Sequence, residues 1–132
     1  MARCVNKIRV RYQETDRMGI VYHSNYFIWF EIGRTELFRK LGVSYRDIES
    51  GGRFLAVTEA RCDYKAPATY DDELEITTLL SEVKRSVIGF EYEIRKDGGI
   101  ITTGSTKHAF LDAKGRPVKI PEALTDALKM KE

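Results

Sequence analysis

Apolar residues recur at helical spacing in one long segment, from Ser24 or Asn25 to Leu41. Positions three or four residues apart form a single stripe of Tyr26, Phe30, Gly33, Leu37 and Leu41. In the N-terminal half, the residues off this stripe are also apolar: Phe27, Ile28, Trp29 and Ile32. A helix that is apolar nearly all round is typical of a buried position, so the rest of the chain is expected to wrap around it.

Small and polar residues mark the ends of this helix. Either Ser24 or Asn25 is expected to cap the N-terminus, because its side chain can accept a hydrogen bond from a free backbone N–H. Gly42 fits the position just beyond the C-terminus. Gly33 costs about 1 kcal/mol relative to Ala in the middle of a helix. The close approach of another backbone is the expected reason for it.

Alternation of apolar and polar residues predicts five strands, at residues 7–12, 53–66, 72–84, 85–96 and 100–112. The inward faces of the third and fourth are expected to carry Leu74, Ile76, Thr78, Leu80, Ile88, Phe90, Tyr92 and Ile94. Residues 97–99, Asp-Gly-Gly, are a hairpin signal. Residues 44–52 are expected to form a loop or short helix, and Pro121 suits the first turn of a short terminal helix.

The order of elements is one strand, one helix and then four strands, with no βαβ alternation. Runs of strands with a segregated helix indicate an α+β fold, with a mostly antiparallel five-stranded sheet curled around the helix. The 132 residues show no linker, repeat or low-complexity segment, so one domain spanning 1–132 is expected.

Composition narrows the function classes. The net charge of +2, with both signs interspersed, disfavours a nucleic-acid surface. No apolar run approaches the roughly 20 residues of a membrane span, and no signal peptide is expected. Cys4 and Cys62 are the only cysteines, which favours a reducing cytoplasm. They form no zinc spacing with His23 and His108, so no metal is expected.

The loop before the helix carries the clearest candidate chemistry. Asp16 lies there, close to the predicted helix N-terminus, where the dipole and free amides favour the charged carboxylate. Such a group suits a nucleophile or general base, although Asp at this place is equally typical of a capping residue. Backbone N–H groups near His23, at the helix start, are suited to stabilising negative charge on an oxygen.

The segment from Thr15 to Glu36 matches the pattern TDxxGxVYHxNYxxxFExxRxE. It resembles the signature of the 4-hydroxybenzoyl-CoA thioesterase family, in the branch with the bacterial Tol–Pal-associated acyl-CoA thioesterases. The resemblance implies a hotdog fold, homodimers with a continuous sheet that often double to tetramers, and an active site at the dimer interface. It also implies that Asp16 is the catalytic acid and that the backbone N–H of His23 is an oxyanion donor.

Several basic and polar residues are candidates for substrate contacts. Lys and Arg are natural binders of the phosphates of coenzyme A. The resemblance implies that a basic cluster at the predicted turn near residue 85 contacts the nucleotide of coenzyme A. The alternative interpretation is that this turn is an ordinary solvated turn with no ligand. The candidates are Lys84, Arg85 and Ser86 of this turn, Lys65, and Tyr22 and Asn25 of the motif.

Glu31 lies on the predicted helix in an apolar setting, where a carboxylate needs a partner. Arg34, three residues further on, is the expected one. A structural ion pair is the leading interpretation of Glu31, and a second catalytic acid is the alternative. The imidazole of His23 is a further candidate, for polarising a carbonyl or orienting water.

These residues favour an acyl-CoA thioesterase in which Asp16 is the nucleophile or general base. Coenzyme A is then part of the substrate, and no cofactor is needed. One alternative is a hotdog dehydratase or hydratase that uses His23 with Glu31. Another is a non-catalytic module that binds acyl-CoA or an acyl carrier protein.

Overall fold

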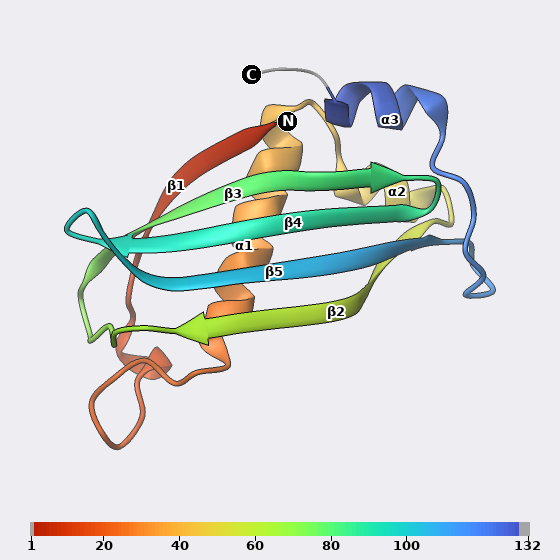
Figure 1. Cartoon of the computed structure of the whole chain (residues 1–132). Helices are drawn as coiled ribbons and strands as arrows, with labels where there is room; N and C mark the ends of the chain where they lie inside the picture. The colour runs from red at the N-terminus through yellow and green to blue at the C-terminus, as the bar shows by residue number, and fades with distance from the viewer. Residues whose placement is uncertain (1, 130–132) are drawn as a thin grey trace.

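One long helix packs against a five-stranded antiparallel sheet that curls around it (Figure 1). This computed structural model describes residues 2–129, so Met1 and residues 130–132 lie outside it. The strands are β1 (Arg3–Arg9), β2 (Phe54–Tyr64), β3 (Glu73–Lys84), β4 (Val87–Lys96) and β5 (Gly99–Leu111). The helices are α1 (Asn25–Lys40), α2 (Tyr45–Ser50) and α3 (Glu122–Lys129), and a 3-10 turn, η1 (Tyr12–Glu14), precedes α1. The predicted α+β fold is confirmed.

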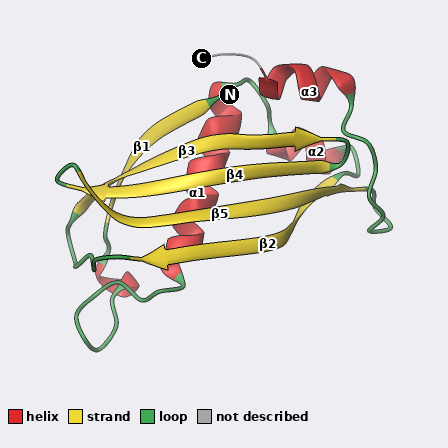
Figure 2. Ribbon diagram, in the orientation of Figure 1, coloured by secondary structure: helices red, strands yellow, loops and turns green. Residues whose placement is uncertain are grey.

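The strand order in the sheet is β1-β3-β4-β5-β2, so β1 and β2 are its two edges (Figure 2). The strands β3, β4 and β5 pair as successive hairpins. In the second hairpin, Asp97 and Gly98 have φ angles of 50° and 81°. Positive φ at both central residues is the type I′ geometry that matches the twist of the flanking strands. The predicted hairpin at residues 97–99 is therefore confirmed.

The alternation along the central strands places their apolar side chains under α1. All the inward residues predicted on β3 and β4 are buried: Leu74, Ile76, Thr78, Leu80, Ile88, Phe90, Tyr92 and Ile94. From the helix side, Phe30 is fully buried, and its ring stacks on Tyr92 with centroids 4.2 Å apart. Aromatic stacking adds to the burial energy and favours one orientation of the rings.

Two glycines let α1 approach the sheet closely. A side chain at Gly104 of β5 would lie 2.8 Å from the backbone oxygen of Arg61 and against the ring of Phe30. A side chain at Gly33 of α1 would collide with the Thr78 hydroxyl of β3. The close approach predicted for Gly33 is thus present, but its partner is a side chain rather than a backbone.

The start of the chain departs from the prediction. A strand was expected at residues 7–12, but β1 ends at Arg9 and Tyr12 begins the turn η1, with its side chain 77% exposed. The strand pattern was misleading here because Val10, which is buried, still continues the alternation while the backbone already turns. Ser24, one of the two predicted N-cap residues, does occupy the N-cap of α1, but the predicted side-chain bond is absent, since its φ and ψ of −69° and −20° are already helical.

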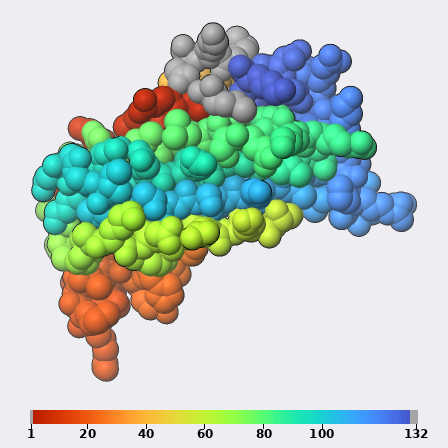
Figure 3. All heavy atoms as spheres, viewed as in Figure 1, coloured from red at the N-terminus to blue at the C-terminus, as the bar shows by residue number. Residues whose placement is uncertain are grey.

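One flank of α1 is open, contrary to the expectation of a fully buried N-terminal half. Ile28 and Ile32 are 50% and 38% exposed. The sheet covers only one side of the helix, and Ile28 and Ile32 lie on the side away from the buried Phe30. Figure 3 shows that the segment before α1, in orange, projects past the β2 edge of the sheet. Among the described residues, no helix is long and apolar enough to cross a membrane.

The tight seating of α1 leads to a prediction about stability. Replacing Gly104 by Ala should lower the free energy of unfolding by about 1–3 kcal/mol, because the new methyl group must displace Phe30 or the β2 backbone. Gly99→Ala is the matched control on β5, since a methyl group there has nothing nearer than 3.7 Å. It should change stability by less than about 0.5 kcal/mol. Denaturant unfolding measures both, and equal effects would contradict the prediction.

Candidate active site

The loop that carries Asp16 is a small hairpin held by its own backbone. Thr15 pairs with Val21, the Asp16 N–H donates to the Ile20 carbonyl at 2.9 Å, and the Gly19 N–H donates to the Asp16 carbonyl at 3.0 Å. Gly19 has a φ of 81°, which favours glycine at the turn. One carboxylate oxygen of Asp16 accepts the Met18 N–H at 2.8 Å. The second oxygen has no partner among residues 2–129, so it is free for a ligand.

The start of α1 lies beside this loop and has unused donors. In the first turn, the N–H groups of Tyr26 and Phe27 donate to the carbonyls of His23 and Ser24 at 3.4 and 3.2 Å. The N–H groups of His23 and Ser24 themselves have no partner among the described residues. Both N–H groups lie at or just before the N-cap, where no helical carbonyl precedes them, so they remain available for an anion or a polarised oxygen.

A pocket of about 350 Å³ joins the loop to the helix start. Its wall includes Asp16, His23, Tyr26, Tyr64, Lys65 and Pro67. Tyr26 is buried under the pocket floor, whereas Lys65 is exposed and forms no ion pair among the described residues. The residues of the wall therefore bring together a carboxylate, a free backbone N–H at His23 and one free ammonium group on a largely apolar surface.

Tyr64, at the end of β2, connects the sheet to the helix start. Its hydroxyl donates to the His23 carbonyl at 2.9 Å. Partial burial raises the pKa of Tyr64, together with the neighbouring Cys62 thiol, so the hydroxyl stays protonated and keeps its donor role. Sequence reasoning missed Tyr64, because only the folded chain brings the two residues together across 41 positions.

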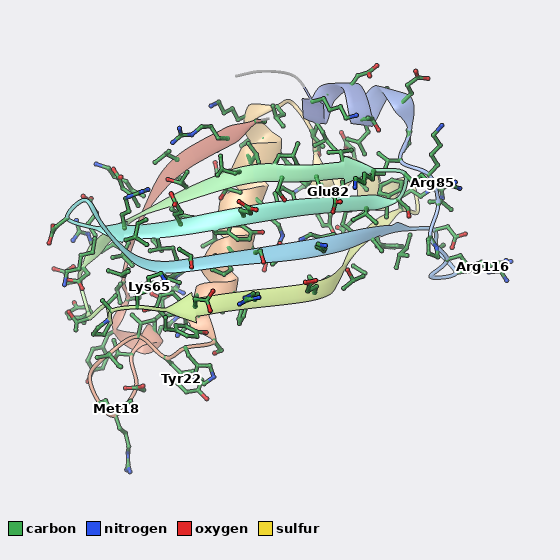
Figure 4. All side chains as sticks on the ribbon, viewed as in Figure 1. Met18, Tyr22, Lys65, Glu82, Arg85 and Arg116 are labelled. Carbon is green, nitrogen blue, oxygen red and sulfur yellow. The ribbon has the colours of Figure 1, made fainter. Side chains whose placement is uncertain are left out.

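The structure separates the remaining predicted substrate contacts into two groups. Lys65 lines the pocket, while Tyr22 and Asn25 flank it without lining it, and the Asn25 amide donates to the Glu14 carbonyl at 2.8 Å. Lys84, Arg85 and Ser86 form the turn between β3 and β4, at the opposite end of the sheet. Figure 4 shows Lys65 and Arg85 at opposite ends of the sheet. Within one chain, the basic turn and Asp16 do not meet.

Glu31 lies one to two turns further along α1 and does not line this pocket. It is exposed and forms no ion pair with Arg34 in the described chain, so the expected buried pair is wrong. The guanidinium of Arg34 instead donates to the Tyr92 hydroxyl at 3.4 Å. The reason is that Glu31 sits on the open flank of the helix, where water can solvate it.

Arg34 begins a chain of buried polar groups. The Tyr92 hydroxyl bonds to Thr106 Oγ1 at 2.6 Å, and Thr106 Oγ1 lies 2.9 Å from Nε2 of His108. Burial, with a contribution from the Arg34 charge, lowers the pKa of His108 to about 4. A cavity of about 90 Å³ lies beside His108 and is separate from the pocket of Asp16. In the described part of the chain, no three His, Cys, Asp or Glu residues are grouped as a metal site.

A long helix wrapped by an antiparallel sheet, with an acid at the helix start, is the hotdog architecture. The chain belongs to the Thioesterase-like superfamily, which matches its residues 10–128. It is 34% identical to the acyl-CoA thioesterase YbgC of Haemophilus influenzae over 122 residues, which cover 91% of this chain and 90% of that protein. The family resemblance of the motif is thereby confirmed at the level of the superfamily.

Solved structures show the same relationship. The DHNA-CoA thioesterase from Staphylococcus aureus superposes with a TM-score of 0.90 at 34% identity, over 96% of this chain and 86% of that chain. A hypothetical protein from Aquifex aeolicus gives a TM-score of 0.91 at 36% identity, over 96% of this chain and 99% of that chain. Both likenesses extend over nearly the whole described chain.

The lowered pKa of His108 predicts a pH-dependent stability. The folded state disfavours the charged imidazole, so between pH 6.5 and about 4 the unfolded state binds more protons. The stabilisation that comes from keeping His108 neutral is fully present above pH 6.5. As the pH falls towards 4, the free energy of unfolding drops by about 3 kcal/mol. The free energy of unfolding of His108→Gln should not show this part of the decrease. Denaturant unfolding from pH 4.5 to 7.5 tests this, and parallel curves for the two proteins would refute it.

Proposed function

We propose that this protein hydrolyses acyl-CoA thioesters to a free acid and coenzyme A. The observation that carries the proposal is that Asp16, with its free carboxylate oxygen, and His23, with its free backbone N–H, line one pocket. The names of the relatives support the substrate class. The motif from Thr15 to Glu36 further supports placement in the 4-hydroxybenzoyl-CoA thioesterase branch.

The chemistry needs a group that attacks the thioester carbonyl and a group that stabilises the resulting oxyanion. Asp16 serves the first need, either by attacking the carbonyl carbon itself or by taking a proton from the attacking water. The N–H of His23 serves the second, because it is fixed in direction by the helix and needs no reorganisation. The C–S bond then breaks and coenzyme A leaves as a thiolate. In the general-base route the thiolate takes the proton that Asp16 removed from water, and the free acid is released directly. In the nucleophilic route water then cleaves the acyl–Asp16 anhydride, which releases the free acid, restores the carboxylate and supplies the proton for the thiolate; no cofactor takes part in either route.

The pocket wall suits the substrate on both sides of the thioester. Tyr26 and Pro67 provide apolar surface for the acyl group next to the carbonyl. Lys65 provides a positive charge at the rim, which suits the negatively charged coenzyme A. The basic turn at Lys84 and Arg85 lies too far along the sheet to contact the same substrate within one chain.

A homodimer through β2 supplies the missing basic group. The strand β2 is an exposed edge of 11 residues, and Val57 on it is 53% exposed. A long exposed edge strand of this kind needs a cover. The other edge is better protected, because the Lys40 ammonium group already donates to the Arg3 carbonyl of β1.

Two-fold symmetry determines what this dimer brings together. An axis perpendicular to the sheet makes the two β2 strands antiparallel, so the Tyr64 end of one strand meets the Phe54 end of the other. Ala56 of β2 and Val87 of β4 both pair with Ala109, so the basic turn lies at the Phe54 end of the sheet. The partner's Lys84 and the partner's Arg85 are then on the same side as Asp16, where they can hold the coenzyme A phosphates.

The first prediction of this function concerns Asp16. Asp16→Asn keeps an oxygen to accept the Met18 N–H but removes the charge, so it should reduce kcat at least ~100-fold. Asp126→Asn is the control, because Asp126 is exposed on α3, which packs against β3 and lies away from both the pocket and the β2 edge. Thiol release from short, long and aromatic acyl-CoAs measures both variants.

The outcomes separate the possible activities. Wild-type turnover that survives in Asp16→Asn would move the chemistry to His23 or Glu31. Binding of acyl-CoA without thiol release by the wild type would instead favour a binding module. Reversible water addition to an enoyl-CoA, measured by absorbance, would identify a hydratase.

The second prediction concerns the dimer. Val57→Asp places a charge on the exposed β2 edge, so it should convert the dimer to a monomer and reduce thioesterase activity with it. Val5→Asp is the control on the other edge, where Val5 is 48% exposed. Light scattering after size-exclusion chromatography measures the mass of each variant. A wild-type monomer with full activity, or a Val57→Asp dimer, would refute the proposed interface.

A further inference from the structure

Glu14 is a charged residue that is buried between the Asp16 loop and the start of α1. Its side chain is only 5% exposed, and it lines none of the pocket of Asp16. One carboxylate oxygen accepts the Arg11 backbone N–H at 2.7 Å. The other accepts the Arg11 guanidinium at 3.2 Å and the indole N–H of Trp29 at 3.1 Å. Three donors on two oxygens satisfy the buried charge, as a buried carboxylate requires.

The backbone carbonyl of Glu14 also accepts hydrogen bonds. It accepts the Tyr22 N–H at 2.9 Å and the side-chain amide of Asn25 at 2.8 Å. One residue thus bonds to the segment after the loop, to the first residue of α1, and through Trp29 to the second turn of α1. No other residue in the site region joins these three segments.

These bonds flank both of the groups on which the proposed reaction depends. Asp16 follows Glu14 by two residues. His23 lies between Tyr22 and Asn25, which both donate to the Glu14 carbonyl. The carboxylate of Asp16 and the free N–H of His23 belong to separate segments, and Glu14 ties each segment to the other.

We propose that Glu14 is a positioning residue, which sets the separation between the Asp16 carboxylate and the oxyanion donors at the start of α1. This inference rests on the proposed function. Glu14 takes no part in proton transfer, because its carboxylate faces Arg11 and Trp29 and not the pocket. Its effect is on geometry, to which catalytic rates are steeply sensitive.

The substitution Glu14→Gln tests the carboxylate with little change of shape. An amide has one acceptor oxygen where the carboxylate has two, and its NH₂ group opposes a donor. Either the Arg11 N–H or the Trp29 indole N–H therefore loses its partner, so the side chain no longer holds the loop and α1 in the same geometry, while the two hydrogen bonds to the Glu14 carbonyl remain. The expected result is a fall in kcat of about 10- to 100-fold, with KM within about threefold of the wild type.

Two further readouts and a control separate positioning from other roles. The pH dependence of kcat should keep its shape, because Glu14 exchanges no proton with the substrate. Trp29 is the only tryptophan, so a shift of its fluorescence maximum reports the loss of the bond to Glu14 without reference to activity. Glu73→Gln is the matched control, because Glu73 pairs with Arg9 at the surface, where its side chain is 50% exposed. This control should leave kcat and fluorescence unchanged.

A second variant keeps the inference testable if Glu14→Gln does not fold. Trp29→Phe removes the indole N–H and leaves the bonds between Glu14 and Arg11 in place. It should also lower kcat with little change of KM, once thermal unfolding has shown that the variant is folded. Normal kcat in either folded variant would overturn the inference and leave the proposed function intact. A wild type that releases no thiol would remove the proposed function and this inference with it.

Discussion

The depth at which α1 sits in the curled sheet is the constraint on which the other features depend. Phe30 lies between the ring of Tyr92 and the bare backbone of Gly104, and there is no space for an added methyl group. Packing at this density allows the helix little freedom to slide or rotate. The helix axis then determines where the first free amides of α1 lie and which flank remains uncovered. The site and the open flank are two consequences of one packing arrangement.

Hydrogen bonds at two levels of α1 add direction to this packing. Apolar contacts tolerate small rotations, whereas a buried N–H that misses its acceptor carries the full cost of desolvation. Near the N-terminus the Trp29 indole donates to Glu14, and further along Arg34 donates to Tyr92. Both donors lie on the side of the helix that faces the rest of the chain. Together they define the rotation of α1 and so the direction of its free N–H groups.

The sequence predicted those parts of the fold that local periodicity controls. Alternation gave the inward faces of β3 and β4 correctly, and the Asp97–Gly98 turn carries its own geometric requirement for positive φ. Of the residues that line the pocket, the motif pointed to Asp16 and the helix start, and Lys65 was a candidate outside the motif because of its charge. Glu14 and Tyr64 were missed, because an acid in a loop and a tyrosine at a strand end carry no local signal of burial or of a distant partner. Glu31 was misjudged because apolar neighbours on a helix do not reveal which flank the sheet leaves uncovered.

Two features of the single chain have one common explanation. The first is the exposed β2 edge, which a protein in water does not leave open without a reason. The second is a basic turn at Arg85 that lies at the opposite end of the sheet from the pocket of Asp16. The proposed pairing of two β2 strands about a two-fold axis accounts for both features, because it covers the edge and brings the partner's Arg85 to the pocket end. A monomer leaves both features unexplained, so the proposed dimer links the symmetry of the assembly to the geometry of the site.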